Sequence, residues 1–200
     1  MRSPHRPART LVVVCHPRAD SLCHAASERV QRGLRTQGAQ TRLIDLYAEA
    51  FEPRLSLHEL RHYGTMVPDE LAAHIEALQW AERVVFVHPT WFSAQPARLK
   101  GWFDRVWLPG VAFDPPPSGR GRLRGRLHNI RRLEIVTTHG SSKWVNRLQV
   151  HSGRRVVFRN LRQVCHPLCR TRFTALYNLD RHDGAAISAW LDQVETRFSR

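Results

Sequence analysis

Short apolar runs alternate with amphipathic segments along most of this chain. Residues 11–15 form a continuous apolar run, LVVVC, as expected for a central strand of a parallel sheet that is covered on both faces. Runs of similar length predict four more strands, at 41–46, 83–88, 133–138 and 171–177. The pattern therefore predicts five short strands separated by longer connections.

The segments between these runs have helical periodicity. Asp20 or Ser21 can cap a first helix, which has apolar residues at every fourth position from Leu22 to Leu34 and ends at Gly38. The same stripe of apolar positions predicts further helices at 69–81, 96–108, 151–164 and 184–198.

Alternating strands and helices predict an α/β fold with an open five-stranded parallel sheet and helices on both faces. The common strand order for such a sheet is 2-1-3-4-5, in which ligands bind at the carboxyl ends of the strands, around the switch point between strands 1 and 3. The Pro-, Gly- and Arg-rich segment 109–126 is predicted to be an exposed loop. Residues 1–200 are interpreted as a single domain.

The charge of the chain is unusual, with a formal net charge of +14 that comes almost entirely from arginine, since Lys100 and Lys143 are the only lysines. Such a charge allows non-specific nucleic-acid binding, and an arginine cluster at 120–132 is the feature that would support it. The basic residues are otherwise spread along the sequence. We therefore favour a basic globular enzyme that attracts anionic phosphates, and expect no specific nucleic-acid partner.

Cysteine usage and hydropathy point to a cytoplasmic protein. The four cysteines are too few for a disulfide framework in a chain of 200 residues, and their spacing matches no zinc motif, so no metal site is expected. No run approaches the roughly 20 apolar residues of a membrane span. The apolar run at 11–15 is also too short for a secretory signal.

The loop after the first strand lacks the glycines of a dinucleotide-binding motif. It reads His16-Pro17-Arg18-Ala19-Asp20-Ser21 and leads into a helix N-terminus, where free backbone amides and the Ser21 hydroxyl can hold one phosphate group. Ser21 can equally be an ordinary helix cap, and both interpretations stay open.

The loop after the third strand is more specific, because it places Trp91 and Phe92 beside a helix start. A flat cofactor ring needs apolar faces against it and backbone groups at its polar edge. Two large rings at the mouth of a sheet favour such a site, whereas Trp102 and Phe103 farther along fit a core role.

From residue 88 onward, the segment HPTWFSAQPARLKGWFDRVWLPGVAFDP resembles the signature of the NAD(P)H:quinone oxidoreductase family. Weaker similarities occur in the same order at His16-Pro17 with Ser21, at 45–53 and at 121–140. The resemblance covers nearly the whole chain and implies a flavodoxin-like fold. It also implies a flavin-dependent enzyme that takes hydride from NAD(P)H and reduces a quinone-like acceptor by a ping-pong mechanism.

The resemblance further implies that FMN or FAD is bound without a covalent bond, by three groups of residues. His16, Ser21 and Leu22 would hold the phosphate end. Pro89, Thr90, Trp91 and Phe92 would line the isoalloxazine ring, and the segment Thr137, Thr138, His139 and Gly140 would meet its polar edge. His151 falls near the spacing of the family's pocket histidine, a catalytic position. It can equally be a polar residue that opens a helix.

Two departures from the family pattern change the expected site. His139 stands where the family usually has glycine, and we expect its side chain to tighten or crowd the pocket. The tyrosine that accompanies the pocket histidine is replaced by Trp144 and Val145 at that spacing.

The resemblance also bears on partners. It implies a homodimer, with Trp107, Phe113 and the surroundings of Tyr63 as candidate interface residues. Because the family includes ancillary flavoproteins of potassium-efflux systems, a regulatory flavoprotein subunit with a membrane-transporter partner is a second hypothesis.

Overall fold

A computed structural model describes residues 8–116, 119–149 and 152–200. Its main sheet is parallel, with the order β2-β1-β3-β6-β7. These strands are β1 (Arg9–Val14), β2 (Gln40–Asp45), β3 (Arg83–Pro89), β6 (Arg132–Thr138) and β7 (Arg170–Leu176). The predicted five-stranded parallel sheet is confirmed. The fourth and fifth strands carry the labels β6 and β7 because a separate two-stranded hairpin precedes them in the chain.

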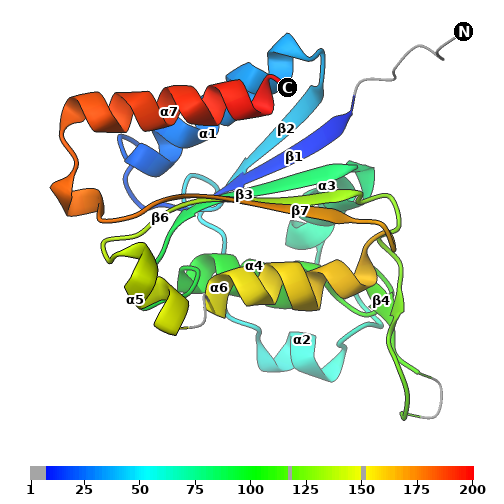
Figure 1. The fold of residues 1–200 in the computed structure, drawn as a ribbon. Helices are drawn as coiled ribbons and strands as arrows, with labels where there is room; N and C mark the ends of the chain where they lie inside the picture. The colour runs from blue at the N-terminus through cyan, green and yellow to red at the C-terminus, as the bar shows by residue number, and fades with distance from the viewer. Residues whose placement is uncertain (1–7, 117–118, 150–151) are drawn as a thin grey trace, which may run out of the picture.

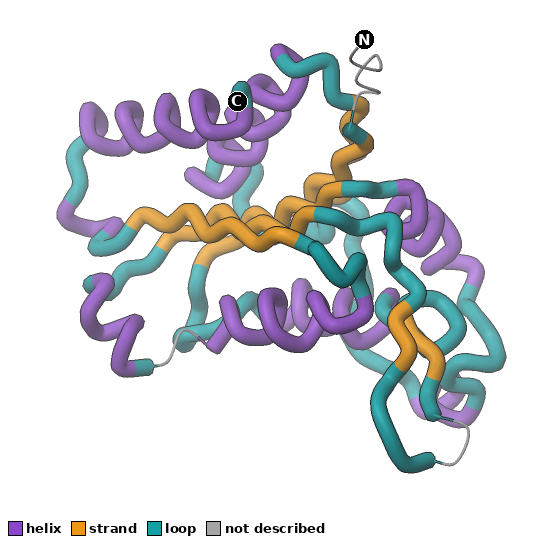
Figure 2. The backbone as a smooth tube through the Cα atoms, turned by 45° about the vertical axis from the view of Figure 1, so that its right-hand side comes forward, coloured by secondary structure: helices purple, strands orange, loops and turns teal. Residues whose placement is uncertain are grey.

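Helices cover both faces of the sheet (Figures 1 and 2). Helices α1 (Leu22–Thr36) and α7 (Gly184–Phe198) lie on one face, and α3 (Ala72–Trp80) and α4 (Ala97–Val106) lie on the other. Alternate residues of each strand face opposite layers, so the apolar runs supply two cores at once. Val12 and Val14 belong to the core under α1 and α7, whereas Leu11 and Val13 belong to the core over α3 and α4.

Local signals explain where α1 begins and ends. The Ser21 side chain accepts a hydrogen bond from the His24 amide, which identifies Ser21 as the N-cap residue. At the other end, Gly38 has a φ of 69°, and its amide and that of Ala39 donate to carbonyls of the last turn. Glycine adopts this left-handed conformation without strain, as the sequence predicted.

The prediction of an exposed loop at 109–126 is correct for most of the described residues of the segment and wrong in two respects. Val111 and Ala112 are buried, and the two-residue strands β4 (Phe113–Asp114) and β5 (Arg124–Gly125) pair as an antiparallel hairpin. The hairpin projects from the main sheet in Figure 2. The turn-forming residues of this segment mark the hairpin loop, and two-residue strands are too short for a period-2 pattern to show.

The region after β6 also differs from the prediction. A helix not expected from the sequence, α5 (Lys143–Leu148), starts at the N-cap Ser142. The helix predicted at 151–164 is irregular: α6 (Ser152–Arg155) continues as one π-helical turn over Val156–Asn160 and one 3-10 turn over Leu161–Val164. The remaining described α-helix, α2 (Leu57–Arg61), is a short helix in the connection between β2 and β3.

Candidate functional site

One cavity of about 370 Å³ lies where the loops at the carboxyl ends of the parallel strands converge. Four of these loops, after β1, β3, β6 and β7, contribute to its wall. The residues that line it are His16, Arg18, Asp20, Ser21, Leu22, Cys23, Pro89, Thr90, Trp91, Thr138, Gly140 and Leu179. The structure thus brings together eight of the twelve residues predicted from the sequence: His16, Ser21, Leu22, Pro89, Thr90, Trp91, Thr138 and Gly140.

The N-terminus of α1 gives one end of the cavity an affinity for anions. The first amides of a helix have no intrahelical partner, and the helix dipole adds positive potential there. Ser21 places its hydroxyl at this point. Arg18 lies on the rim, but its guanidinium binds the carboxylate of Asp20 at 2.8 and 3.0 Å, which offsets its charge. The helix amides and Ser21 are therefore the main candidates for holding a phosphate group.

Ser21 is also part of a hydrogen-bonded trio that the sequence analysis missed. Its Oγ lies 2.9 Å from Nδ1 of His24, and Nε2 of His24 lies 2.8 Å from Oδ2 of Asp45 at the end of β2. In the sequence, His24 simply follows Cys23 inside the first helix, and no spacing pattern links it to Asp45. The trio connects the phosphate end of the cavity to β2.

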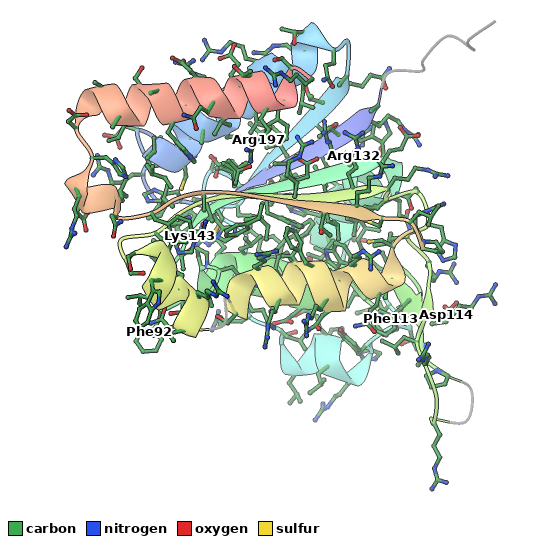
Figure 3. The ribbon with its side chains drawn as sticks, viewed as in Figure 1. Phe92, Phe113, Asp114, Arg132, Lys143 and Arg197 are labelled. Atoms are coloured by element: carbon green, nitrogen blue, oxygen red, sulfur yellow. The ribbon has the colours of Figure 1, made fainter. Side chains whose placement is uncertain are left out.

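Trp91 and its neighbour Phe92 have different environments. The amide and carbonyl of Trp91 bond to those of Ala94, closing a tight turn whose central residues, Phe92 and Ser93, both have positive φ. Trp91 keeps one side against the cavity, with its ring centroid 6.1 Å from that of His16, and is 42% exposed. Phe92 stands at the tip of the turn and its side chain is fully exposed beside α5 (Figure 3). Phe92 therefore does not line the cavity in this structure, and its contact with a flavin ring stays a prediction.

Strand alternation divides the predicted residues of β6 between two faces. Thr138 faces the cavity, whose lining also includes Cys23. The side chains of Thr137 and His139 point to the opposite face of the sheet and do not line the cavity. The side chains of Thr137 and His139 are therefore not part of the cavity wall, and only their backbone could meet the polar edge of a cofactor bound there.

His139 does not crowd the cavity, contrary to our expectation. It is buried and stacks on Tyr177, with centroids 4.7 Å apart and an interplanar angle of 12°. Thr137 Oγ1 lies 3.0 Å from Oγ1 of Thr90, which in turn lies 3.5 Å from Nε2 of His139. A polar cluster therefore supports the floor of the cavity from below. His151, the predicted catalytic histidine, lies outside the described residues.

The thiols near the cavity are not nucleophiles at neutral pH. Burial raises the pKa of Cys15 to about 12 and that of Cys23 to about 12, although a backbone hydrogen bond or Thr138 opposes the shift in each case. A thiol with such a pKa stays protonated and unreactive. Among the described residues, no three or more His, Cys, Asp or Glu side chains gather as a metal site would require.

His88, at the end of β3 below the cavity, should make the fold sensitive to acid. Burial lowers its pKa to about 4, against the smaller opposing effect of the Pro89 carbonyl 3.0 Å from Nδ1. The unfolded chain binds this proton near pH 6.5 and the folded chain only near pH 4, so stability falls as pH drops through this window. Between these pH values we expect the wild type to lose about 3 kcal/mol of its free energy of unfolding, and His88→Leu not to show this loss.

The measurement is urea unfolding at several pH values between about 4 and 7, on the wild type and His88→Leu. The control variant is His128→Leu, because His128 is exposed on the far side of the fold. The same pH slope in the wild type and in His88→Leu would show that His88 is not buried in its neutral form.

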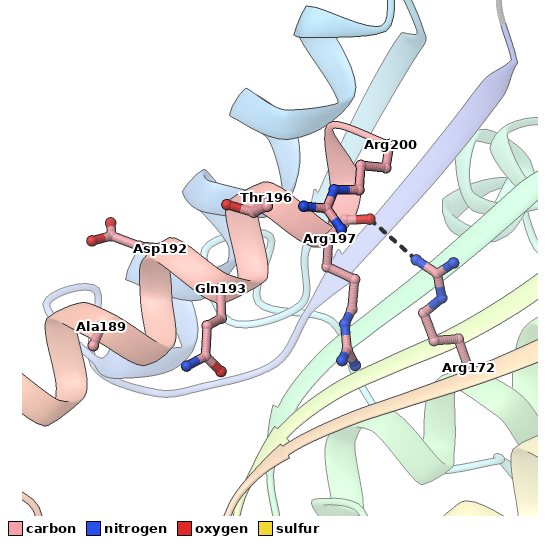
Figure 4. A pocket seen from close by; sticks show the side chains of 7 residues that line it. All are labelled: Arg172, Ala189, Asp192, Gln193, Thr196, Arg197 and Arg200. Carbon is pink, nitrogen blue, oxygen red and sulfur yellow. Dashed lines mark hydrogen bonds between the residues drawn. The ribbon is translucent and has the colours of Figure 1, made fainter.

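A larger hollow, of about 810 Å³, lies between α7 and the edge strand β7 (Figure 4). It is lined by Arg172, Ala189, Asp192, Gln193, Thr196, Arg197 and Arg200. The strand-end loops do not reach it, and no aromatic side chain lines it. Its residues offer no face for a flat ring. We therefore choose the smaller cavity, where the strand-end loops converge, as the candidate site, although this hollow has the larger volume.

Comparisons with known proteins identify the family of the chain. The chain matches the family described as having a flavodoxin-like fold over residues 8–197. It is 34% identical over 166 residues to the ribosyldihydronicotinamide dehydrogenase (quinone) of Pongo abelii. This match covers 72% of this chain and 68% of that protein. It is 27% identical to the NAD(P)H dehydrogenase (quinone) 1 of Rattus norvegicus, of which the match covers 60%.

Two solved structures share the fold. The NAD(P)H:quinone oxidoreductase of Methanothermobacter marburgensis superposes with a TM-score of 0.82 at 21% identity, over 97% of this chain and 96% of that chain. An FMN-dependent NADH-azoreductase of Bacillus anthracis, in complex with FMN, superposes with a TM-score of 0.71 at 16% identity, over 96% of this chain and 98% of that one.

In the part of the chain that the structure describes, no helix combines the length and apolar character needed to cross a membrane. The family match spans nearly all of the sequence, and the relatives' names agree with the resemblance seen in the segment from residue 88 onward. This chain belongs to the flavodoxin-like family, among the NAD(P)H:quinone oxidoreductases.

Proposed function

We propose that this protein is a flavin-dependent oxidoreductase that takes hydride from NAD(P)H and passes two electrons to a quinone-like acceptor. The observation that carries this proposal is the meeting of the loops after β1, β3 and β6 at one cavity. A phosphate-binding end, an aromatic wall and a polar edge are the three things that a flavin needs, and they lie around this one space.

The residues of the cavity fit the parts of a flavin. The amides at the start of α1, with Ser21, would hold the phosphate group. Trp91 would cover part of the isoalloxazine ring, and Thr138 and the backbone at Gly140 would meet its polar edge. The names of the relatives, one of them an FMN-dependent azoreductase, support this assignment. FMN and FAD both remain candidates.

Bound flavin would supply the hydride acceptor and the two-electron donor of the reaction. The protein's part would be to bind and orient the cofactor and its two substrates, since the cavity holds no activated thiol and stacking geometry accounts for catalysis by proximity. NAD(P)H and the acceptor would use the same open face in turn, which gives ping-pong kinetics.

The proposed enzyme would be a homodimer. Apart from isolated side chains such as Leu43 and Leu168, the large apolar side chains exposed among the described residues gather in two groups, one around α2 and one on α5 with the neighbouring turn. They are Leu57, Leu60, Tyr63, Met66 and Val67 in the first, and Phe92, Trp144 and Leu148 in the second. Exposed apolar patches of this kind mark interaction surfaces. Of the interface candidates chosen from the sequence, Trp107 is buried in the core and is excluded, Phe113 is half-buried, and Tyr63 is exposed.

The test is spectroscopic and kinetic. We expect the purified protein to show the visible absorption of oxidised flavin, or to acquire it when FMN or FAD is added. It should then oxidise NADH or NADPH in the presence of menadione, with parallel lines in double-reciprocal plots at varied menadione. A protein that binds neither flavin and oxidises neither nucleotide would contradict the proposal.

A further inference from the structure

The trio of Ser21, His24 and Asp45 has a defined arrangement of protons at one end. The Oδ1 atom of Asp45 accepts hydrogen bonds from the amides of Tyr47 and Ala48, and its Oδ2 faces His24. Burial alone would raise the pKa of Asp45, but the hydrogen bonds from His24 and these amides outweigh it and lower the pKa. The carboxylate is therefore ionised at neutral pH and can only accept, so Nε2 of His24 carries a hydrogen.

The other end of the trio depends on the charge of His24. In a neutral ring with its hydrogen on Nε2, Nδ1 is an acceptor, and the Ser21 hydroxyl must donate to it across 2.9 Å. In a charged ring, Nδ1 also carries a hydrogen and donates to Ser21 Oγ. The hydroxyl hydrogen is then free to point elsewhere.

This difference decides what Ser21 offers to the cavity. Its Oγ already accepts from the His24 amide at 3.3 Å. With neutral His24 the hydroxyl has only a lone pair left for the cavity, which repels a phosphate oxygen. With charged His24 the hydroxyl can donate to that oxygen, and such charge-assisted hydrogen bonds are about twice as strong as neutral ones.

We propose that His24, held by Asp45, is a positioning residue for phosphate binding: the phosphate group of the cofactor binds together with a proton on His24, which turns the Ser21 hydroxyl toward it. The inference rests on the proposed flavin site and adds to it a coupling between cofactor affinity and pH. By linkage, a ligand that favours the protonated form binds more weakly as pH rises and takes up a proton when it binds.

Other groups near the trio also carry charge or titrate. They are His16, Arg18 and Asp20 on the loop after β1, Glu49 after β2, whose carboxylate accepts from the Asp45 amide, and Arg98 on α4. Burial lowers the pKa of His16, so this ring adds little charge at neutral pH. The phosphate of FMN itself titrates near pH 6. A test must therefore compare variants and not rest on the pH profile of one protein.

The experiment compares two ligands that differ only in the phosphate, FMN and riboflavin, on protein freed of its own flavin and shown to re-bind FMN. Dissociation constants are measured by flavin fluorescence between about pH 5.5 and pH 8.5, so that binding is compared on the acid and the alkaline side of neutrality. The variants are His24→Phe, which keeps a ring and removes both hydrogen bonds, and Asp45→Asn, which removes the charge that favours the imidazolium. The matched control is His128→Phe, at an exposed histidine outside the cavity.

We expect His24→Phe to weaken FMN binding about tenfold at the acid end of the range, because the imidazolium charge that orients the Ser21 hydroxyl and strengthens its hydrogen bond to the phosphate is lost. Riboflavin binding should change less than about twofold. As pH rises, the gap between wild type and His24→Phe should narrow and then reverse, because neutral His24 takes the Ser21 hydrogen whereas phenylalanine leaves the hydroxyl free to donate. Asp45→Asn should shift the decline of FMN affinity to lower pH. Calorimetry of FMN binding in two buffers of different ionisation enthalpy should detect proton uptake in the wild type and less in His24→Phe.

The possible failures are distinguishable. If neither FMN nor riboflavin binds to the wild type, the proposed function fails. If both bind but His24→Phe weakens them equally, or leaves the FMN to riboflavin ratio unchanged at every pH, the flavin site stands and the role of His24 is refuted. Equal losses in His24→Phe and His128→Phe would also refute it.

Discussion

Replacing Glu134 by glutamine should destabilise this protein by about 3–5 kcal/mol, the cost of leaving one partner of a buried ion pair alone. Arg83 and Glu134 lie on the neighbouring strands β3 and β6, and both side chains are at least 95% buried, with Oε1 of Glu134 3.0 Å from Nη2 and 3.1 Å from Nε of Arg83. Burial lowers the pKa of Arg83, and the carboxylate of Glu134 opposes this shift.

The surroundings make the loss of this carboxylate more costly. Arg132 and Arg172 both act on Arg83 as like charges, and the guanidinium lies over the ring of Phe198 at 5.4 Å. Without Glu134, three arginines would share one region beneath α7 with their nearest counter-ion gone. Guanidinium chloride would screen these charges, so unfolding in urea at low and high salt is the better measurement.

A double variant supplies the control. Arg83→Met combined with Glu134→Leu removes both charges and keeps the volume, and such replacements of buried ion pairs are often neutral or stabilising. We expect the double variant to stay within about 1 kcal/mol of the wild type. A loss below about 1 kcal/mol in Glu134→Gln alone would show that water reaches the Arg83 side chain.

The fold could be predicted from the sequence because its signals are local. Each central strand is buried on both faces, so the run at 11–15 and its counterparts are apolar throughout, and this separates them from amphipathic helices. Ser21 and Gly38 mark the two ends of α1, because their side-chain type and backbone conformation suit the start and the end of a helix. The hairpin of β4 and β5 escaped prediction because its pairing depends on Val111 and Ala112 being buried by distant parts of the chain.

The site could be predicted only in outline. Parallel strands place all their carboxyl ends at one edge of the sheet, so the loops containing Ser21, Trp91 and Thr138 had to meet. Successive side chains of a strand point to opposite faces of the sheet, so this alternation decides which of them enter the cavity. Thr138 enters it, and its neighbours Thr137 and His139 therefore face away. The contact of His24 with Asp45 joins residues 21 positions apart and leaves no periodic trace in the sequence.

Trp91 and Phe92 were both predicted to line the flavin ring, but the structure places Trp91 against the cavity and Phe92 at the exposed tip of the turn. Comparing the two residues therefore gives a sharp test of the cavity. We expect Trp91→Ala to weaken flavin binding roughly 30-fold. The isoalloxazine ring would lose its contact with the face of the indole, which is worth about 2 kcal/mol. Phe92→Ala should change it less than about twofold, since Phe92 is fully exposed at the tip of the turn.

Both variants are measured by fluorescence titration with FMN, and by oxidation of NADPH with menadione at limiting and at saturating flavin. Loss of activity in Trp91→Ala that recovers at saturating flavin would assign the residue to cofactor binding, whereas a loss that persists would assign it to substrate stacking. Because Phe92 lies beside α5 on the exposed apolar surface, its substitution should instead favour the monomer in sedimentation experiments. Equal losses of flavin affinity in the two variants would mean that the turn refolds over the cofactor, and that the cavity seen here is not the one that binds it.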